Sequence, residues 1–224
     1  MGKLNKNDIK FIAEHCKNVY LKKHIGSLVG ENITYFKDDN INGYTFSLAG
    51  VTYIIVAGTD EFSDWLANLK IPLVRADGEN FWCRVHSGFY SSYKQVRDHI
   101  TKATKDKSRV IIAGHSLGGA IATLASFELA TANQDLELYC VTFGSPRVGN
   151  RNFAGKFNKR VKESYRLVYR DDAVTKLPNS LLLFKHVKTL YQSSKRRFLT
   201  YFGRPGDHDM ENYIEGVQDD MFKL

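Results

Sequence analysis

Residues 110–120 read VIIAGHSLGGA. An apolar run that is typical of a buried strand ends at Gly114, and a helix rich in small residues begins just after Ser116. A serine in the spacing G-x-S-x-G on a strand-to-helix turn is a nucleophile elbow, because so tight a turn tolerates only small neighbours. The amides and positive dipole end of the helix favour an oxyanion beside the serine. The stretch predicts a serine hydrolase with Ser116 as its nucleophile, and the flanking strand and helix disfavour a purely structural glycine turn.

Length and composition are those of a globular protein. The chain has 224 residues, of which 43% are hydrophobic and 12% aromatic, so we expect a single domain over residues 1–224. No apolar run is long enough for a transmembrane segment. The formal net charge is +8, but the cations are scattered, which disfavours nucleic acid as a partner. The local excess of cations over residues 185–204 fits either a solvated basic face or peripheral contact with lipid surfaces.

Three cysteines are too few, and odd in number, for a disulfide framework. Cys140 lies in an apolar run and is expected to be a small buried side chain, whereas pairing between Cys16 and Cys83 is left open. The N-terminal residues lack the apolar core of a signal peptide. We therefore expect a cytoplasmic protein, with non-classical secretion as the alternative.

Apolar periodicity and turn residues predict alternating strands and helices. The expected architecture is an α/β fold with a mostly parallel central sheet flanked by helices. Helices are expected at Asn7–Lys22, Asp60–Lys70, Ser87–Ala103, Leu117–Ala130, Asn150–Val161 and from His208 to about Val217, and strands at Tyr44–Leu48, Val51–Val56, Phe81–Val85, Val110–Ala113, Leu136–Phe143, Tyr165–Tyr169 and Leu181–Val187.

A serine nucleophile needs a base and an orienting carboxylate, which follow it in the order acid then histidine on this type of sheet. Only His186 and His208 lie late enough in the chain, and His208 is favoured because it lies in a polar turn rather than in an apolar run. Asp171 and Asp172 both follow the predicted strand Tyr165–Tyr169, where a carboxylate would face the site. Composition alone does not choose between these two acids.

An oxyanion hole needs a second backbone amide besides that of Leu117. The strongest early strand ends at Gly58, whose lack of a side chain allows close approach of the backbone. The amide of Thr59 is therefore the expected second donor.

Several short motifs appear in a fixed order around the elbow. They are Gly58-Thr59 with Ser63-Asp64-Trp65-Leu66 and Asn68-Leu69; Val85-His86-Ser87-Gly88-Phe89; Thr142-Phe143-Gly144-Ser145-Pro146-Arg147-Val148-Gly149-Asn150; Asp172-Ala173-Val174 leading to Leu177-Pro178; and His208 followed by Asn212-Tyr213. With these motifs the chain resembles the class 3 lipases, the fungal-type α/β-hydrolases, over residues 50 to 215. The resemblance implies an α/β-hydrolase fold with a short lid helix.

The resemblance also settles the two open choices. In the family the acid precedes a valine and prolines, a register that selects Asp172, although Thr175 stands where proline is usual. The family base lies shortly before a C-terminal aromatic residue, which selects His208, and the second oxyanion donor corresponds to Thr59.

The residues after Thr59 resemble the family's lid, a short amphipathic helix over the serine. Its apolar side chains, which would also contact substrate, are Phe62, Trp65, Leu66 and Leu69. The alternative is an ordinary surface helix that packs on the core through Trp65.

Taken together, these features predict a serine carboxylester hydrolase that cleaves acylglycerols or phospholipids through an acyl-enzyme, with no metal and no cofactor. One alternative is an esterase for small soluble or aryl esters, since the same three side chains serve those substrates. Another is a non-catalytic interaction module on the same fold.

Overall fold

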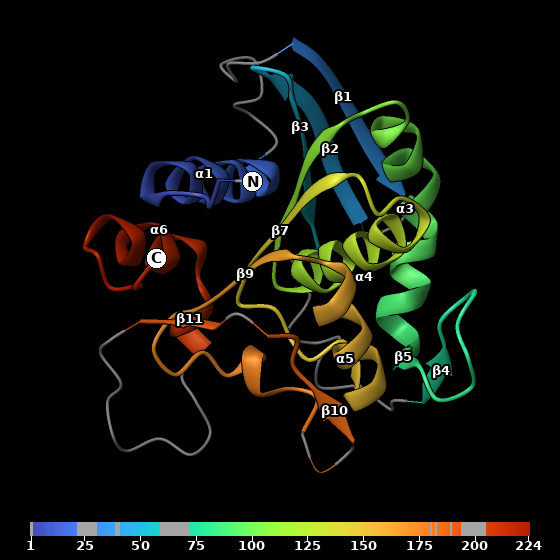
Figure 1. The fold of residues 1–224 in the computed structure, drawn as a ribbon. Helices are drawn as coiled ribbons and strands as arrows, with labels where there is room; N and C mark the ends of the chain where they lie inside the picture. The colour runs from blue at the N-terminus through green and yellow to red at the C-terminus, as the bar shows by residue number, and fades with distance from the viewer. Residues whose placement is uncertain are drawn as a thin grey trace.

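The computed structural model describes residues 2–21, 31–38, 41–58, 72–179, 181, 183–188, 190–193 and 205–224. Its centre is a seven-stranded sheet in the order β1-β2-β3-β6-β7-β9-β11. Strands β1 to β3 pair antiparallel, whereas β3, β6, β7, β9 and β11 run parallel. Figure 1 shows this mostly parallel sheet with helices against it, as the alternating sequence pattern predicts. The strands are β1 Glu31–Asp38, β2 Ile41–Leu48, β3 Val51–Ala57, β4 Leu73–Arg75, β5 Arg84–His86, β6 Arg109–His115, β7 Glu137–Phe143, β8 Gly149–Asn150, β9 Glu163–Val168, β10 Phe184–Lys185 and β11 Leu190–Gln192.

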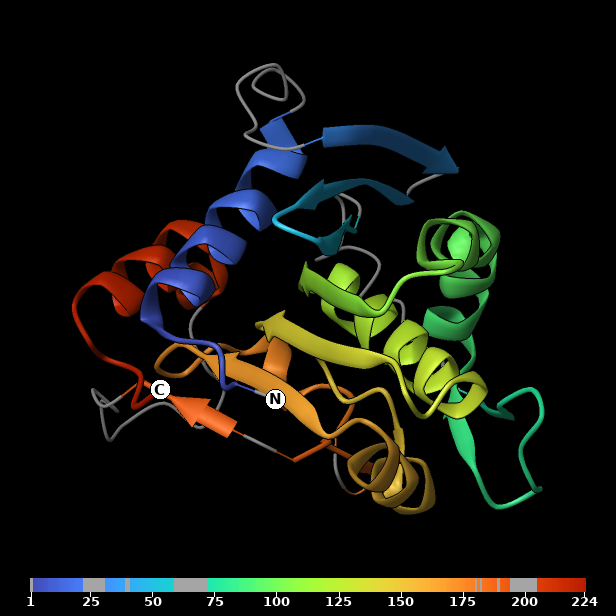
Figure 2. The same cartoon turned by 45° about the horizontal axis from the view of Figure 1, so that its top comes forward.

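Helices cover both faces of the sheet, so the central strands are buried on both sides. The helices are α1 Lys6–Leu21, α3 Ser87–Thr104, α4 Leu117–Ala132, α5 Arg151–Arg160 and α6 Met210–Gln218, with short 3-10 turns η2 Val174–Lys176 and η4 Pro205–His208. One core lies under α3, α4 and α5, and the other lies under α1 and α6. Figure 2 shows α1 and α6 side by side on their face of the sheet. Because α6 begins two residues after His208, this packing holds the C-terminal candidate base in place.

A second sheet is small and antiparallel, in the order β10-β8-β5-β4. It joins the hairpin of β4 and β5 to the segments that follow β7 and the η2 turn. None of the strands β4, β8 and β11 was expected from the sequence, because runs of two or three residues carry no periodicity. Strand β1 was also missed, since its side chains are mostly exposed and polar.

Two of the expected strands are wrong in extent. The strand predicted at Phe81–Val85 begins only at Arg84. The residues before it form a turn, in which the Cys83 amide donates to the Asn80 carbonyl at 3.0 Å. Within the predicted strand Leu181–Val187, only Phe184–Lys185 is strand. Hydrophobicity alone misplaced both strands, because several of their apolar side chains are exposed: Phe81, Trp82, Leu181 and Leu183.

The predicted helix ends were also shifted. Helix α1 begins at Lys6 and is capped by Asn5, whose side-chain oxygen accepts from the Asn7 and Asp8 amides at 2.8 and 3.1 Å. Asp8 in turn accepts from the Asn5 amide at 2.8 Å, which is the reciprocal arrangement of a capping box. The last helix begins at Met210, because the η4 turn occupies the residues up to His208.

Candidate active site

Ser116 lies on the turn between β6 and α4, as the elbow motif predicts. Its backbone has φ 58° and ψ −124°, a conformation that non-glycine residues rarely adopt. The two flanking glycines are required by space: a Cβ on Gly118 would lie 2.1 Å from the Val56 carbonyl oxygen, and one on Gly114 would lie 2.3 Å from the Gly118 carbonyl carbon. The close approach of β3, β6 and α4 therefore depends on both glycines.

Three of the predicted side chains meet at the C-terminal end of the parallel strands. The Nε2 atom of His208 lies 2.8 Å from Ser116 Oγ, and its Nδ1 atom lies 2.8 Å from Asp172 Oδ2. These are the nucleophile–base and base–acid contacts that acyl transfer to a serine needs. The residues come from three segments, with His208 92 positions after Ser116 and 36 after Asp172.

The rejected histidine has a different role. His186 Nε2 donates to the Thr175 carbonyl at 2.6 Å, and so supports the turn that follows Asp172. Burial, together with the nearby Arg166 guanidinium, lowers the pKa of His186 to about 3. A neutral imidazole that bonds a backbone carbonyl is a structural group, which agrees with the sequence-based preference for His208.

Asp172 is fully buried and well supplied with donors. Its Oδ1 atom accepts from the Val174 amide at 2.9 Å, while its Oδ2 atom accepts from the Tyr213 hydroxyl at 2.6 Å as well as facing His208. The Oδ1 atom of Asp171, in contrast, lies 3.8 Å from Lys176 Nζ. The structure thus brings Asp172, and not its neighbour, to the histidine.

Nothing in the sequence alone assigned a role to Tyr213. Burial and the adjacent carboxylate raise its pKa well above the ordinary value, so the hydroxyl remains a donor. The position of this aromatic residue shortly after His208 was the one available signal.

His115, inside the elbow motif, was also missed. Its Nε2 atom donates to the His208 carbonyl at 2.7 Å, and the two imidazole rings lie with centroids 4.4 Å apart. Burial lowers the pKa of His115 well below its ordinary value, so the ring stays neutral. It therefore anchors the backbone of the candidate base without adding a charge to the site.

Gly144 closes the far side of the site, where β7 ends. Its φ is +59°, and a Cβ there would lie 2.7 Å from Asp172 Oδ2 and 2.9 Å from His208 Nδ1. The imidazole–carboxylate pair thus fits only because this position has no side chain.

The predicted oxyanion donors are described only in part. Leu117 is buried at the start of α4, and a Cβ on Gly58 would lie 2.6 Å from Leu117 Cβ, so the end of β3 touches the elbow. Thr59 and the expected lid residues Phe62, Trp65, Leu66 and Leu69 lie outside the described residues. Their roles stay predictions.

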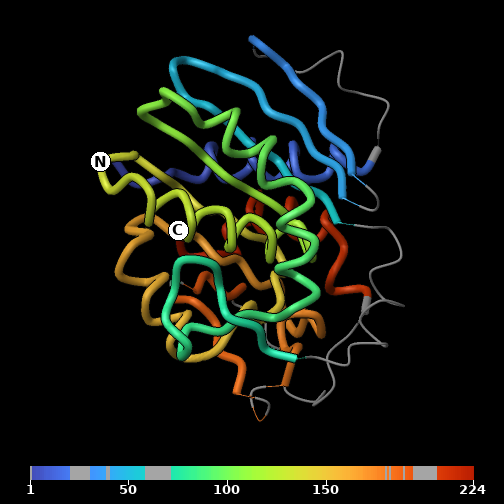
Figure 3. Tube along the Cα trace, turned by 90° about the vertical axis from the view of Figure 1, so that its right-hand side faces the viewer, coloured from blue at the N-terminus to red at the C-terminus, as the bar shows by residue number. Residues whose placement is uncertain are grey.

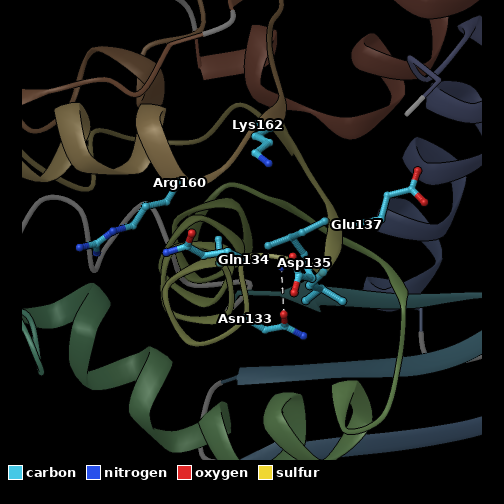
Figure 4. Close-up of a pocket in the computed structure, with 9 residues that line it drawn as sticks. Asn133, Gln134, Asp135, Glu137, Arg160 and Lys162 are labelled. Atoms are coloured by element: carbon cyan, nitrogen blue, oxygen red, sulfur yellow. Dashed lines mark hydrogen bonds between the residues drawn. The ribbon is translucent and has the colours of Figure 1, made fainter.

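A surface pocket of about 270 Å³ lies elsewhere, at the end of the sheet away from Ser116. Figure 4 shows its polar lining from the ends of α4 and α5 and the start of β7: Asn133, Gln134, Asp135, Glu137, Arg160 and Lys162. Ligands of open α/β sheets bind outside the carboxyl ends of the strands. The pocket is therefore not part of the site around Ser116.

Comparison with known proteins places this geometry in a family. The model of the family described as lipase (class 3) matches residues 53–182, more than half of the chain. The chain belongs to the class 3 lipase family. The match spans β3, the elbow and the loop of Asp172.

Two relatives illustrate the similarity. A secreted mono- and diacylglycerol lipase 1 of Fusarium solani is 31% identical over 144 residues, which cover 62% of this chain and 42% of the relative. A chloroplastic phospholipase A(1) DAD1 of Arabidopsis thaliana is 35% identical over 147 residues, which cover 56% of this chain and 33% of the relative. The matched part thus spans less than half the length of either relative.

Solved structures confirm the α/β-hydrolase fold. Lipase II from Rhizopus niveus superimposes with a TM-score of 0.78 at 22% identity, covering 92% of this chain and 94% of that one. Among the described residues of this class 3 lipase, no helix is long and apolar enough to cross a bilayer.

The expected cytoplasmic location is contradicted by these comparisons, because fungal relatives are named as secreted lipases and the plant relative as chloroplastic. The physical ground for the prediction was weak. Cys16, Cys83 and Cys140 are all free and buried. Buried thiols do not depend on a reducing compartment, since burial raises the pKa of Cys83 and Cys140 to about 11 and suppresses the reactive thiolate.

Proposed function

We propose that this chain is a serine carboxylester hydrolase that cleaves acylglycerols or phospholipids. The observation that carries the proposal is the pair of 2.8 Å contacts that joins Ser116 to His208 and His208 to Asp172. Membership of the class 3 lipase family supports the same reaction class.

In the proposed mechanism, His208 Nε2 takes the proton of Ser116 as Oγ attacks the ester carbonyl. Asp172 holds the Nδ1–H tautomer and stabilises the imidazolium that forms. The amides of Leu117 and Thr59 stabilise the tetrahedral oxyanion, and His208 then protonates the departing alcohol. Water, deprotonated by the same imidazole, hydrolyses the acyl-enzyme and frees the fatty acid.

The substrate class follows from the relatives, which are named for mono- and diacylglycerols and for phospholipase A(1) activity. Peripheral contact with lipid surfaces is part of the proposal, because such substrates lie in aggregates or bilayers. The secreted fungal relatives support action outside the cytoplasm.

The test compares the wild type with Ser116→Ala and with Ser91→Ala, which removes an exposed hydroxyl on α3. Hydrolysis of a long-chain glyceride is followed across its solubility limit, beside hydrolysis of a soluble short-chain ester. We expect the wild type and Ser91→Ala to hydrolyse the glyceride and to react with a fluorophosphonate, and Ser116→Ala to do neither. Activity on the short ester alone would favour the esterase alternative, and full activity of Ser116→Ala would refute the assignment.

A further inference from the structure

An aromatic pair stands exposed at the hairpin between β4 and β5. Phe81 is 60% and Trp82 67% exposed, which makes them the most exposed aromatic side chains among the described residues. Figure 3 shows the hairpin running along the surface, outside the helices. Exposing two large apolar rings side by side is unfavourable in water and needs an explanation.

The pair is held in place by the surrounding structure. The rings of Phe81 and Trp82 meet edge to face with centroids 5.5 Å apart. The Trp82 carbonyl accepts from the side-chain amides of Asn150, at 2.8 Å, and Asn152, at 3.2 Å. The rings are therefore presented by a fixed backbone.

The hairpin is fastened to α5 as well. The carboxylate of Glu79, whose side chain is only 5% exposed, pairs with both Lys156 and Arg160. These cations, with the hydrogen bonds of Glu79, hold its pKa below the ordinary value against the opposing effect of burial. The hairpin therefore has a rigid attachment to the body of the protein.

Cations surround the aromatic pair along the small sheet. The Arg84 guanidinium lies 4.8 Å from the centre of the Phe81 ring, and Arg75 is its cross-strand partner. Helix α5 adds Arg151, its first residue, immediately after Asn150 of β8, and β10 adds Lys185 opposite Gly149. Within the described part of the chain, none of these four cations forms an ion pair.

Nearby acids do not cancel this charge. Glu79 is already paired with two cations of α5, and Asp77 lies 3.7 Å from Arg97 on α3, a cation that it shares with Glu128. The surface therefore combines exposed aromatic rings with four cations that form no ion pair among the described residues. Aromatic residues of this kind gather at membrane interfaces, and basic residues are attracted to anionic headgroups.

We propose that this aromatic hairpin, residues 76–83 with its basic rim, docks the protein on an anionic lipid surface. The inference rests on the proposed function, since a lipid surface is where that substrate lies. A protein partner fits less well, because stable protein interfaces bury about 800 Å² on each side and two ring side chains supply only part of that. In the sequence, residues 76–83 of the hairpin share no position with the predicted lid at residues 60–69.

The experiment reads docking directly and without hydrolysis. In the variant Trp65→Phe with Ser116→Ala, Trp82 is the chain's remaining tryptophan. Its fluorescence is recorded with vesicles of phosphatidylcholine and with vesicles that also contain phosphatidylserine, with and without brominated acyl chains. We expect a blue shift and quenching by the brominated lipid, both much stronger with phosphatidylserine.

Binding is then measured by co-sedimentation for matched variants. Removing each cation of the rim should weaken binding about fivefold, so Arg75→Gln with Arg151→Gln should lose about 25-fold. The control, Lys105→Gln with Lys107→Gln, removes the same charge from an exposed turn after α3. Trp82→Ser should weaken binding at least tenfold, whereas Tyr35→Ser, at another exposed aromatic residue, should not.

An unshifted Trp82 spectrum on anionic vesicles would overturn the proposal, as would equal losses in the two charge variants. A shift that depends on protein concentration without vesicles would instead identify a second copy of the chain as the occupant. Soluble-ester hydrolysis by the wild type tests the proposed function separately. If that activity were absent, the vesicle result would still stand on its own.

Discussion

Replacing Gly144 by alanine should disable the site from a position that takes no part in proton transfer. The new Cβ would lie 2.7 Å from Asp172 Oδ2 and 2.9 Å from His208 Nδ1. Ordinary contact begins near 3.4 Å, so the carboxylate or the ring must retreat by about 0.7 or 0.5 Å. A hydrogen bond of 2.8 Å does not survive such a shift.

The size of the effect follows from this displacement. Misplacing a reacting group by about 1 Å costs about 10² in rate, and losing the oriented tautomer altogether costs about 10⁴. We therefore expect kcat to fall by about 10² to 10⁴ with little change in KM. The left-handed backbone of Gly144 adds about 1–2 kcal/mol of strain, and the crowding about 1–3 kcal/mol, to the loss in free energy of unfolding.

The assay is steady-state hydrolysis of a soluble short-chain ester, together with urea unfolding of the same samples. Gly155→Ala is the matched control: a Cβ there meets nothing within 4 Å, and the residue lies inside α5. That variant should keep its kcat and gain up to about 1 kcal/mol of stability. A folded Gly144→Ala protein with a kcat within a few-fold of the wild type would refute the reasoning.

Three further predictions concern buried polar groups. Tyr213→Phe removes the hydroxyl that donates to the buried Asp172 carboxylate at 2.6 Å. The free energy of unfolding in urea should therefore fall by about 1.5–3 kcal/mol, and kcat should fall about tenfold. Unchanged values of both would contradict the role given to this hydroxyl. Glu79→Gln leaves two cations of α5 without their carboxylate and should cost about 1–3 kcal/mol in the same measurement, with soluble-ester kcat unaffected. Burial lowers the pKa values of His15 and His86 to about 4. Between about pH 6.5 and pH 4 these histidines are therefore protonated in the unfolded chain but not in the folded chain, so the free energy of unfolding should fall by up to about 3 kcal/mol for each as the pH is lowered. In urea unfolding across this pH range, His15→Asn should show a smaller fall than the wild type.

Local chemistry predicted the centre of the sheet and the elbow. Long apolar runs such as Val110–Ala113 have few alternatives to burial, and Gly114 and Gly118 are needed by an approach so close that any Cβ collides with backbone. The order of serine, acid and histidine also follows from how the chain crosses such a sheet.

Other features depend on partners far away in the sequence. Composition could not separate Asp171 from Asp172, because only the folded turn decides which carboxylate faces the histidine. The hydroxyl of Tyr213 lies 41 positions from its acceptor on Asp172, so no local pattern reveals the contact. Phe81 was predicted to lie in a strand because hydrophobicity does not distinguish a buried aromatic ring from an exposed one.

The contact between α1 and α6 can form only after α6 has been synthesised, so it is a late step in folding. Lys6 bonds the Gln218 carbonyl across 212 positions and pairs with Asp220 at 2.7 Å. The imidazole that should activate Ser116 comes from the segment just before α6, so the nucleophile can emerge and fold well before its base is present. A nascent chain with a finished sheet is then still inert. During refolding, the recovery of hydrolysis would then report the packing of α6 on α1 rather than the earlier formation of the strands.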